Sequence, residues 1–235
     1  MKVSVVCPVF NEEKTVKTIA KVLRESEFLD EVLFADDGSR DRTFEILKKF
    51  ESERIKILRL KENRGKSFAL FLGIKNCQGE IVVFLDGDLL GLKKEHLASL
   101  VFPLFQKRAR YVIGVPTKKF QKIVKPWEIY LSGERAYFKA DLIPYLKKFP
   151  NLGYGIEVFL NFIFPPKDGK IVFLRGLISP SKFKKRTKKE AVKEYLKETK
   201  EVFKASANLK ISPKWIFQIF SSYLLAVKEF SMQKS

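Results

Sequence analysis

Short runs of β-branched and apolar residues alternate with helical patterns through the first half of the chain, and this rhythm constrains the fold more than any other feature. The strand-like runs are Val3–Cys7, Glu31–Ala35, Ile55–Leu60, Ile81–Leu85 and Tyr111–Val115. The helical patterns between them are Glu12–Glu25, Arg42–Glu51, Lys66–Lys75 and Lys93–Gln106. Such alternation is typical of a parallel sheet with helices on both faces. We therefore predict an α/β fold with a mostly parallel, Rossmann-like sheet.

The rhythm weakens after residue 115, where the pattern becomes more helical. We expect a loop at Pro116–Pro126, which is rich in lysine, and a strand at Lys170–Arg175. Further helical patterns cover residues 127–140, 141–148, 153–164 and 188–205. The tail Pro213–Met232 has the apolar spacing of an amphipathic helix. We predict one main domain over residues 1–210, followed by a C-terminal amphipathic helix over residues 211–235.

The charge balance points to an anionic partner. The chain has 46 Lys and Arg against 27 Asp and Glu, a formal net charge of +19, which attracts phosphate-rich molecules. Nucleic acid, an anionic membrane and a phosphorylated small molecule all fit this charge, and so does a solubilising surface without a partner. Two cysteines, Cys7 and Cys77, are too few for a disulfide framework or a zinc site, which favours the cytoplasm. No run approaches the roughly 20 apolar residues of a membrane-spanning helix, and the first residues lack the layout of a signal peptide.

Polar side chains directly follow three of the predicted strands. These groups are Asn11-Glu12, Asp36-Asp37-Gly38-Ser39 and Asp86-Gly87-Asp88. The carboxyl ends of parallel strands meet at one edge of a sheet, where ligands of such folds bind and helix N-termini can face phosphates. We therefore expect the functional site at this edge.

The run Asp86-Gly87-Asp88 predicts a divalent cation. Two carboxylates one residue apart can share Mg²⁺ or Mn²⁺ with a nucleotide diphosphate, because hard cations prefer oxygen ligands. An ordinary turn is the alternative, since Asp-Gly after a strand is a common turn sequence. The polar groups at the other two strand ends favour the metal.

The pair Asp36-Asp37 is harder to explain by local structure. A capped helix start accounts for Ser39 or Asp41, but not for two adjacent carboxylates at the mouth of the sheet. Their mutual repulsion predicts a ligand or a cation nearby.

Four sequence blocks carry a resemblance to a known family. They are Val3–Glu12, Asp36–Ser39, Asn63-Arg64-Gly65-Lys66 and Asp86–Asp88. In this order and spacing they resemble the family 2 type glycosyltransferases with the GT-A fold, and the likeness covers roughly residues 3–90. The resemblance implies a nucleotide-sugar-binding half over residues 1–115 and an acceptor half over residues 116–210.

The same resemblance implies a role for each matching residue. The residues implied to line the nucleotide pocket are Pro8, Phe10, Asn11 and Glu12, with one carboxylate of Asp36 and Asp37 bonding the base. Lys66 would approach the donor diphosphate. Asp86 and Asp88 would hold the Mg²⁺ or Mn²⁺ that neutralises the departing nucleoside diphosphate. Gly87 stands where relatives often have alanine.

A looser likeness lies downstream, in Leu131–Ala136 and Gly153–Glu157. It is similar to the acceptor half of polyprenyl-phosphate sugar synthases and of glucosyl-phosphoglycerate and mannosylglycerate synthases, whose acceptors are anionic. Arg135 is then expected to contact a donor or acceptor phosphate, because a guanidinium binds phosphate through paired hydrogen bonds; a surface ion pair is the alternative. Glu157 would position the acceptor or act as a general base, with a helix cap or packing as the alternative. The phosphoglycerate-type relatives use a histidine as a metal ligand near residues 176–180, where this chain has none, which leaves water or Ser179 as the third ligand.

These observations predict a metal-dependent glycosyltransferase with Asp88, Arg135 and Glu157 as its catalytic residues. We expect it to move a hexose from a UDP- or GDP-sugar to an anionic acceptor, with polyprenyl phosphate favoured over a soluble glycerate-type acceptor. The net charge and the tail at residues 213–232 favour peripheral contact with an anionic membrane on its cytoplasmic side. A non-catalytic module that binds membrane or nucleic acid is the alternative from another class, and the retained acidic residues argue against it. The sequence leaves the sugar, the base, the stereochemistry and the oligomeric state open.

Overall fold

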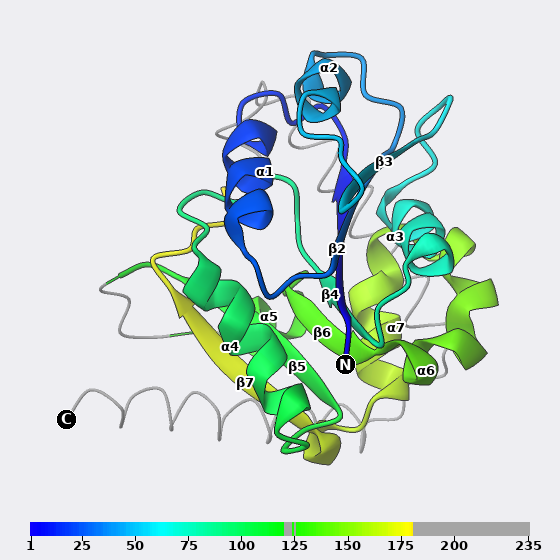
Figure 1. Cartoon of the computed structure of the whole chain (residues 1–235). Helices are drawn as coiled ribbons and strands as arrows, with labels where there is room; N and C mark the ends of the chain where they lie inside the picture. Colours follow the sequence, from blue (N-terminus) through cyan, green and yellow to red (C-terminus); the bar gives the residue numbers. More distant parts are fainter. Residues whose placement is uncertain (120–123, 125, 181–235) are drawn as a thin grey trace.

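The computed structural model describes residues 1–119, 124 and 126–180 (Figure 1). The strands are β1 (Val3–Val9), β2 (Glu31–Asp36), β3 (Ile55–Arg59), β4 (Ile81–Phe84), β5 (Tyr111–Thr117), β6 (Arg135–Phe138) and β7 (Gly169–Arg175). The α-helices are α1 (Val16–Glu25), α2 (Thr43–Lys48), α3 (Lys66–Asn76), α4 (Lys94–Phe105), α5 (Pro126–Tyr130), α6 (Lys139–Leu142) and α7 (Ile156–Ile163). The 3₁₀-helices are η1 (Ile143–Asn151), η2 (Gly153–Gly155) and η3 (Pro166–Asp168).

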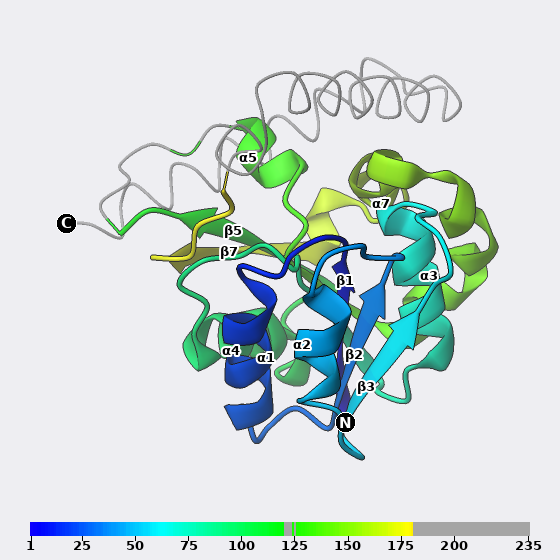
Figure 2. The same cartoon turned by 90° about the horizontal axis from the view of Figure 1, so that it is seen from above.

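The described strands form one seven-stranded sheet in the order β3-β2-β1-β4-β6-β5-β7. Strand β6 runs antiparallel to β4 and β5, and the other paired strands are parallel. Helices α1, α2 and α4 lie on one face, and α3, α6 and α7 lie on the other (Figures 1 and 2). The predicted α/β architecture with a mostly parallel sheet is therefore confirmed. Strands from both predicted halves of the domain belong to this one sheet.

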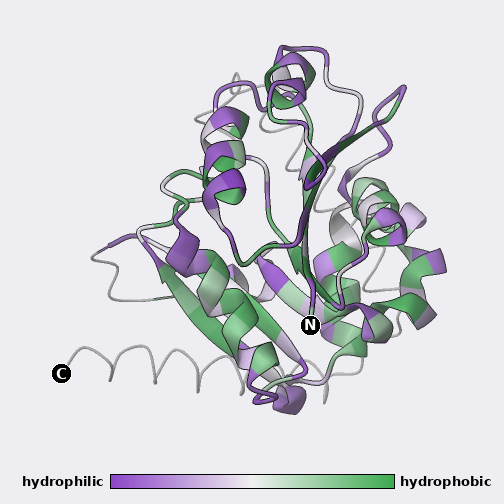
Figure 3. Ribbon diagram, in the orientation of Figure 1, coloured by the Kyte–Doolittle hydropathy of each residue, from purple (hydrophilic) through white to green (hydrophobic). Residues whose placement is uncertain are grey.

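Each face of the sheet carries its own hydrophobic core. In β1, Val3 and Val5 join the core that includes α1 and α4, whereas Val6 joins the core that includes α3 and α7. Successive side chains of a strand point to opposite faces, so the continuous apolar runs of this sequence supply both cores. Figure 3 shows the central strands largely in hydrophobic green and many of the outer loops in purple.

The elements of the first half agree with prediction to within a few residues, and β7 is the strand predicted at Lys170–Arg175. The helix predicted over residues 127–140 is wrong, because α5 ends at Tyr130 and Arg135–Phe138 form β6 between β4 and β5. Long-range strand pairing overrides the local pattern there. The helix predicted over residues 141–148 is replaced by the end of α6 and by η1, in which Pro144 and Pro150 cannot donate helical hydrogen bonds.

Two predicted helices, over residues 188–205 and 211–235, lie outside the described residues, as does part of the lysine-rich loop at 116–126. In the part of the chain that is described, no helix is both long and apolar enough to cross a membrane.

Candidate active site

The carboxyl ends of β1, β2 and β4 meet at one edge of the sheet, because these neighbouring strands are parallel. The loops that follow them are tied together. The Asn11 N–H donates to Ser39 Oγ over 3.0 Å, and the Arg40 N–H donates to Asn11 Oδ1 over 2.8 Å. The Thr15 hydroxyl donates to the Gly87 carbonyl oxygen over 2.8 Å. The structure thus brings together the three strand ends that carry the predicted site.

The residues predicted to line the nucleotide pocket lie at this edge. Pro8 is near the end of β1, and Phe10 follows the strand; both are half-buried. Asn11 has a φ of 56°, in the left-handed region that asparagine tolerates better than most residues. The Glu12 N–H donates to Thr43 Oγ1 over 2.7 Å, which fixes the loop against the start of α2. Contact of these residues with a nucleotide stays a prediction.

The carboxyl groups of Asp36 and Asp37 are buried and partnered within the protein. Asp36 Oδ1 accepts a backbone N–H three residues along the chain, and Asp36 Oδ2 lies 3.5 Å from Arg59 Nε. The oxygens of Asp37 accept the backbone N–H groups of Arg64 and Gly65, over 2.7 and 2.8 Å. These contacts offset part of the repulsion between the carboxylates within the protein, although Asp36 Oδ2 accepts no hydrogen bond from the described residues. A ligand or cation beside the pair stays a prediction. Bonding of a base by one of them stays a prediction.

Lys66 begins α3 and reaches into the same edge of the sheet. Its Nζ lies 2.7 Å from Asp86 Oδ1 and 2.8 Å from Glu157 Oε1. Burial lowers the pKa of Lys66, but the charges of the two carboxylates outweigh burial and raise the pKa well above its ordinary value. Lys66 is therefore a permanent cation at this edge. Glu157, at the start of α7, holds the ammonium in place, and its role as a base or acceptor contact stays a prediction.

The side chains after β4 fit Mg²⁺ or Mn²⁺. Asp86 and Asp88 offer carboxylate oxygens, the ligands that hard cations prefer. Gly87 keeps the loop close to β1, because a Cβ there would lie 2.6 Å from Val9 Cγ1. Residues 1–119, 124 and 126–180 contain no cluster of three or more His, Cys, Asp or Glu able to hold a metal. Ligation of a cation by Asp86 and Asp88, with water or Ser179 as a third ligand, stays a prediction.

Glu134 is a buried carboxyl group at this edge that the sequence analysis did not single out. It directly precedes β6, and the pairing of Arg135 with Phe84 brings Gly133 beside Asp86. A Cβ at Gly133 would lie 2.5 Å from Asp86 Oδ2. Burial, and after it the charge of Asp86, raises the pKa of Glu134 to about 8. A carboxylate directly before a short apolar stretch could have indicated a residue at the end of a strand. Because a helix was predicted over residues 127–140, Glu134 was not placed at this edge of the sheet.

Arg135 does not face the mouth of the site, because its side chain is 1% exposed. Nε donates to the Ser132 carbonyl oxygen over 2.7 Å, one terminal nitrogen donates to Asn161 Oδ1 over 2.9 Å, and the other donates to the Tyr130 carbonyl oxygen over 3.0 Å. The predicted phosphate contact is therefore wrong, and so is the alternative of a surface ion pair. The guanidinium instead joins the end of α5 to β6 and α7.

His96 packs at the start of α4 and is held there by two hydrogen bonds. Its Nδ1 accepts a backbone N–H from the residue before the helix, which leaves Nε2 to donate to the Arg175 carbonyl oxygen over 3.1 Å. Burial lowers the pKa of His96. An isolated bridge between Leu90 and Ile178 brings the segment that contains Ser179 beside the loop after β4. Metal ligation by Ser179 stays a prediction.

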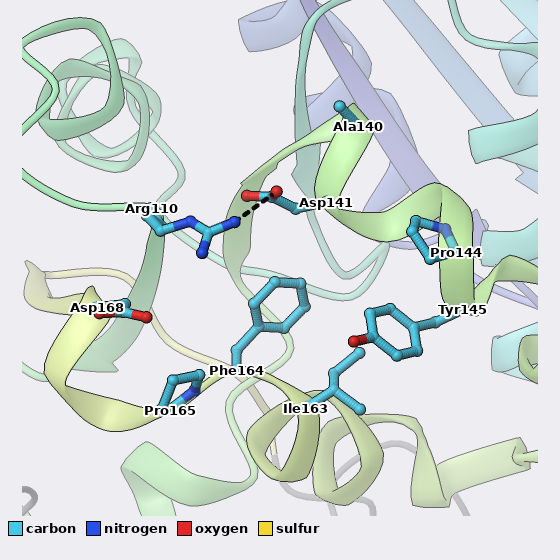
Figure 4. A pocket seen from close by; sticks show the side chains of 9 residues that line it. All are labelled: Arg110, Ala140, Asp141, Pro144, Tyr145, Ile163, Phe164, Pro165 and Asp168. Atoms are coloured by element: carbon cyan, nitrogen blue, oxygen red, sulfur yellow. Dashed lines mark hydrogen bonds and ion pairs between the residues drawn. The ribbon is translucent and has the colours of Figure 1, made fainter.

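A cavity of about 260 Å³ lies at the opposite edge of the sheet, where β5 and β7 begin (Figure 4). Its lining residues are Arg110, Ala140, Asp141, Pro144, Tyr145, Ile163, Phe164, Pro165 and Asp168. Arg110 and Asp141 form an ion pair of 2.7 Å across part of it. None of the predicted site residues lines this cavity, so it is separate from the candidate active site.

The model of the family described as Glycosyl transferase family 2 matches residues 4–164. Human dolichyl-phosphate beta-glucosyltransferase is 33% identical over 179 residues, which are 69% of this chain and 50% of that protein. The bactoprenol glucosyl transferase of Shigella phage SfX is 39% identical over 95 residues, which are 38% of this chain and 31% of that protein. The chain therefore spans half or less of the length of these two relatives.

The fold matches solved structures of glucosyl-3-phosphoglycerate synthase from Mycobacterium tuberculosis. The complex with Mn²⁺, UDP and glucosyl-3-phosphoglycerate gives a TM-score of 0.71 at 21% identity and covers 90% of this chain and 81% of that chain. The complex with Mn²⁺, UDP-glucose and phosphoglyceric acid gives 0.70 at 21% identity, with coverage of 90% and 80%. At this identity the likeness establishes the fold, and it confirms the GT-A architecture that the sequence predicts.

Proposed function

The chain belongs to glycosyl transferase family 2, and on this premise we propose that it transfers a hexose from a nucleoside diphosphate sugar to an anionic acceptor. The observation that carries the proposal is the cluster of Lys66, Asp86 and Glu157 at the carboxyl edge of the sheet, with Asp88 in the same loop as Asp86. Carboxylates suited to a divalent cation, beside a half-buried ammonium, fit a diphosphate that leaves with developing negative charge.

Each member of the cluster has a task in this reaction. Asp86 and Asp88 would hold Mg²⁺ or Mn²⁺, which when bound supplies positive charge to the departing nucleoside diphosphate. Lys66 provides a second, fixed positive charge beside Asp86. Glu157 keeps the ammonium at the edge of the sheet. An acceptor phosphate is already ionised, so the reaction needs no general base to activate it.

The donor that we propose is UDP-glucose. Two relatives are named as glucosyltransferases, and the M. tuberculosis synthase is seen with UDP-glucose. In this proposal the nucleotide binds between the loops that follow β1 and β2, against Pro8, Phe10, Asn11 and Glu12. GDP-sugars are the alternative donors.

The acceptor that we propose is polyprenyl phosphate. The two curated relatives are named for dolichyl phosphate and bactoprenol. Leu90 and Ile178, which pair with each other, are 46% and 41% exposed, and Leu131 is 47% exposed. Leu90 is two residues beyond Asp88, and these apolar side chains suit an isoprenoid chain next to the site. A phosphoglycerate-type acceptor is the competing candidate, because the solved neighbours bind phosphoglyceric acid.

Peripheral contact with an anionic membrane belongs to the same proposal. It is supported by the net charge of +19, since each Lys or Arg near anionic headgroups adds about 1 kcal/mol of attraction. Membrane or nucleic-acid binding without catalysis would not explain why Lys66, Asp86 and Glu157 converge from distant parts of the chain.

Product formation with a panel of substrates tests the proposal. The protein is given UDP-glucose or GDP-mannose, polyprenyl phosphate or 3-phosphoglycerate, and Mn²⁺ or a chelator. We expect Mn²⁺-dependent transfer from UDP-glucose to polyprenyl phosphate, lost in Asp88→Asn and kept in Asp168→Asn, whose carboxylate lies at the opposite edge. Transfer to 3-phosphoglycerate alone would assign a soluble acceptor. If the protein neither bound nor turned over any nucleotide sugar, the enzymatic function would be contradicted.

A further inference from the structure

Glu134 has a buried oxygen that the described part of the protein leaves without a hydrogen-bond partner. The side chain is 2% exposed. Ser132 Oγ lies 2.8 Å from Glu134 Oε2, whereas Glu134 Oε1 has no partner among the described residues. An unpartnered buried acceptor is unfavourable, and such groups are uncommon in native proteins. This oxygen is therefore a candidate contact for a bound ligand.

The hydrogen bonds around Ser132 define what Oε1 can accept. The single hydroxyl hydrogen of Ser132 faces two acceptors, the Gly114 carbonyl oxygen and Glu134 Oε2. If Glu134 carries a proton on Oε2, it donates to Ser132, and Ser132 donates to Gly114, so every group in the chain is satisfied. Oε1 is then the carbonyl oxygen of a neutral carboxyl group, which accepts a hydrogen bond and offers none. A hydroxyl group is its natural partner.

The position of Glu134 indicates which hydroxyl this is. Glu134 adjoins the groups assigned above to the metal and the diphosphate, because a Cβ on its neighbour Gly133 would lie 2.5 Å from Asp86 Oδ2 and 2.7 Å from Lys66 Nζ. Gly133, the preceding residue, has no side chain to cover the Asp86–Lys66 pair. The part of a nucleotide sugar joined to the far end of the diphosphate is the hexose, which carries several hydroxyl groups. A phosphate does not fit, because both it and a carboxyl group present acceptor oxygens.

We propose that Glu134 is a donor-sugar contact, in which Oε1 accepts a hydrogen bond from one hydroxyl group of the transferred hexose. This inference rests on the proposed function. It gives Glu134 a part in selecting the sugar, because a buried acceptor that is left unpaired disfavours a donor lacking the matching hydroxyl.

Calorimetric titration of the full chain with UDP and with UDP-glucose, both with Mn²⁺, tests the contact. In Glu134→Ala we expect the affinity for UDP-glucose to fall about three- to tenfold, the worth of one net hydrogen bond. The affinity for UDP should not change, since UDP lacks the hexose. Glu134→Gln should keep most of the affinity for UDP-glucose, because its amide oxygen can still accept. An equal loss for UDP and UDP-glucose, or no loss for either, would overturn the proposal.

A second titration has a first arm that does not depend on the folding of any variant. The unsubstituted protein is titrated with UDP-glucose analogues that lack one hydroxyl each, at the 2, 3, 4 or 6 position. We expect one analogue to bind more weakly than UDP-glucose, and that difference to vanish in Glu134→Ala. Equal binding of all analogues by the unsubstituted protein would refute the contact. If the unsubstituted protein bound neither UDP nor UDP-glucose, the proposed function would fail, and this inference with it.

Discussion

The buried carboxyl group of Glu134 should make the stability of the folded chain fall as pH rises, and Glu134→Gln should remove this dependence. Burial and the charge of Asp86 raise the pKa of Glu134 from 4.5 to about 8. Because the pKa of Glu134 is higher in the folded chain than in the unfolded chain, the full contribution of this group to the free energy of unfolding is present below about pH 4.5. It is lost as pH rises through about 8, because the unfolded chain has released a proton that the folded chain retains.

The expected magnitude follows from this pKa difference. Each pH unit between the two pKa values costs about 1.4 kcal/mol, so the protein should lose about 4 kcal/mol relative to Glu134→Gln between pH 5 and pH 9. The neutral amide has the shape of the protonated carboxyl group and does not titrate. The difference in the free energy of unfolding between the two proteins removes the contributions of the other titrating groups, which both proteins share.

Urea unfolding in metal-free buffer at pH 5, 7 and 9, followed by circular dichroism, measures this difference. Glu53→Gln, at an exposed position, is the matched control for the removal of one carboxyl group. If the free energy of unfolding of Glu134→Gln relative to the unsubstituted protein stayed constant across this pH range, the burial of a protonated Glu134 would be refuted.

Three further predictions concern the site and its support. Asp88→Asn should abolish Mn²⁺-dependent transfer while the melting temperature stays within a few degrees, because it removes one ligand charge at the mouth of the sheet; retained turnover would remove Asp88 from the metal site. Gly133→Ala should lower turnover by tenfold or more. The new methyl group would lie 2.5 Å from Asp86 Oδ2 and 2.7 Å from Lys66 Nζ, so it would push these two side chains apart. Unchanged steady-state kinetics would contradict this prediction. Arg135→Met should lower the free energy of unfolding by about 3 kcal/mol or more, because the carbonyl oxygens and the amide oxygen around the guanidinium lose their donor. Urea unfolding measures this loss. A variant as stable as the unsubstituted protein would contradict a structural role for Arg135.

The alternation of strands and helices could be predicted from the sequence because its cause is local. A run such as Ile81–Phe84 is apolar at every position and short, which fits a strand buried on both faces. The polar groups that follow it then fall at the same edge as those after β1 and β2, since parallel strands place all their carboxyl ends together. For that reason Asn11, Asp36 and Asp86 could be assigned to one site before any contact was known.

The sequence did not reveal β6 or the contacts that depend on it. Residues 135–138 become a strand only because β4 and β5 are there to pair with them, and this pairing turns Arg135 into the interior and brings Gly133 and Glu134 to the site. Likewise, Lys66 meets Glu157 although 91 positions separate them. Local pattern determined which residues end each strand, whereas only the tertiary structure decided which charges face one another, because that depends on contacts between segments far apart in the chain.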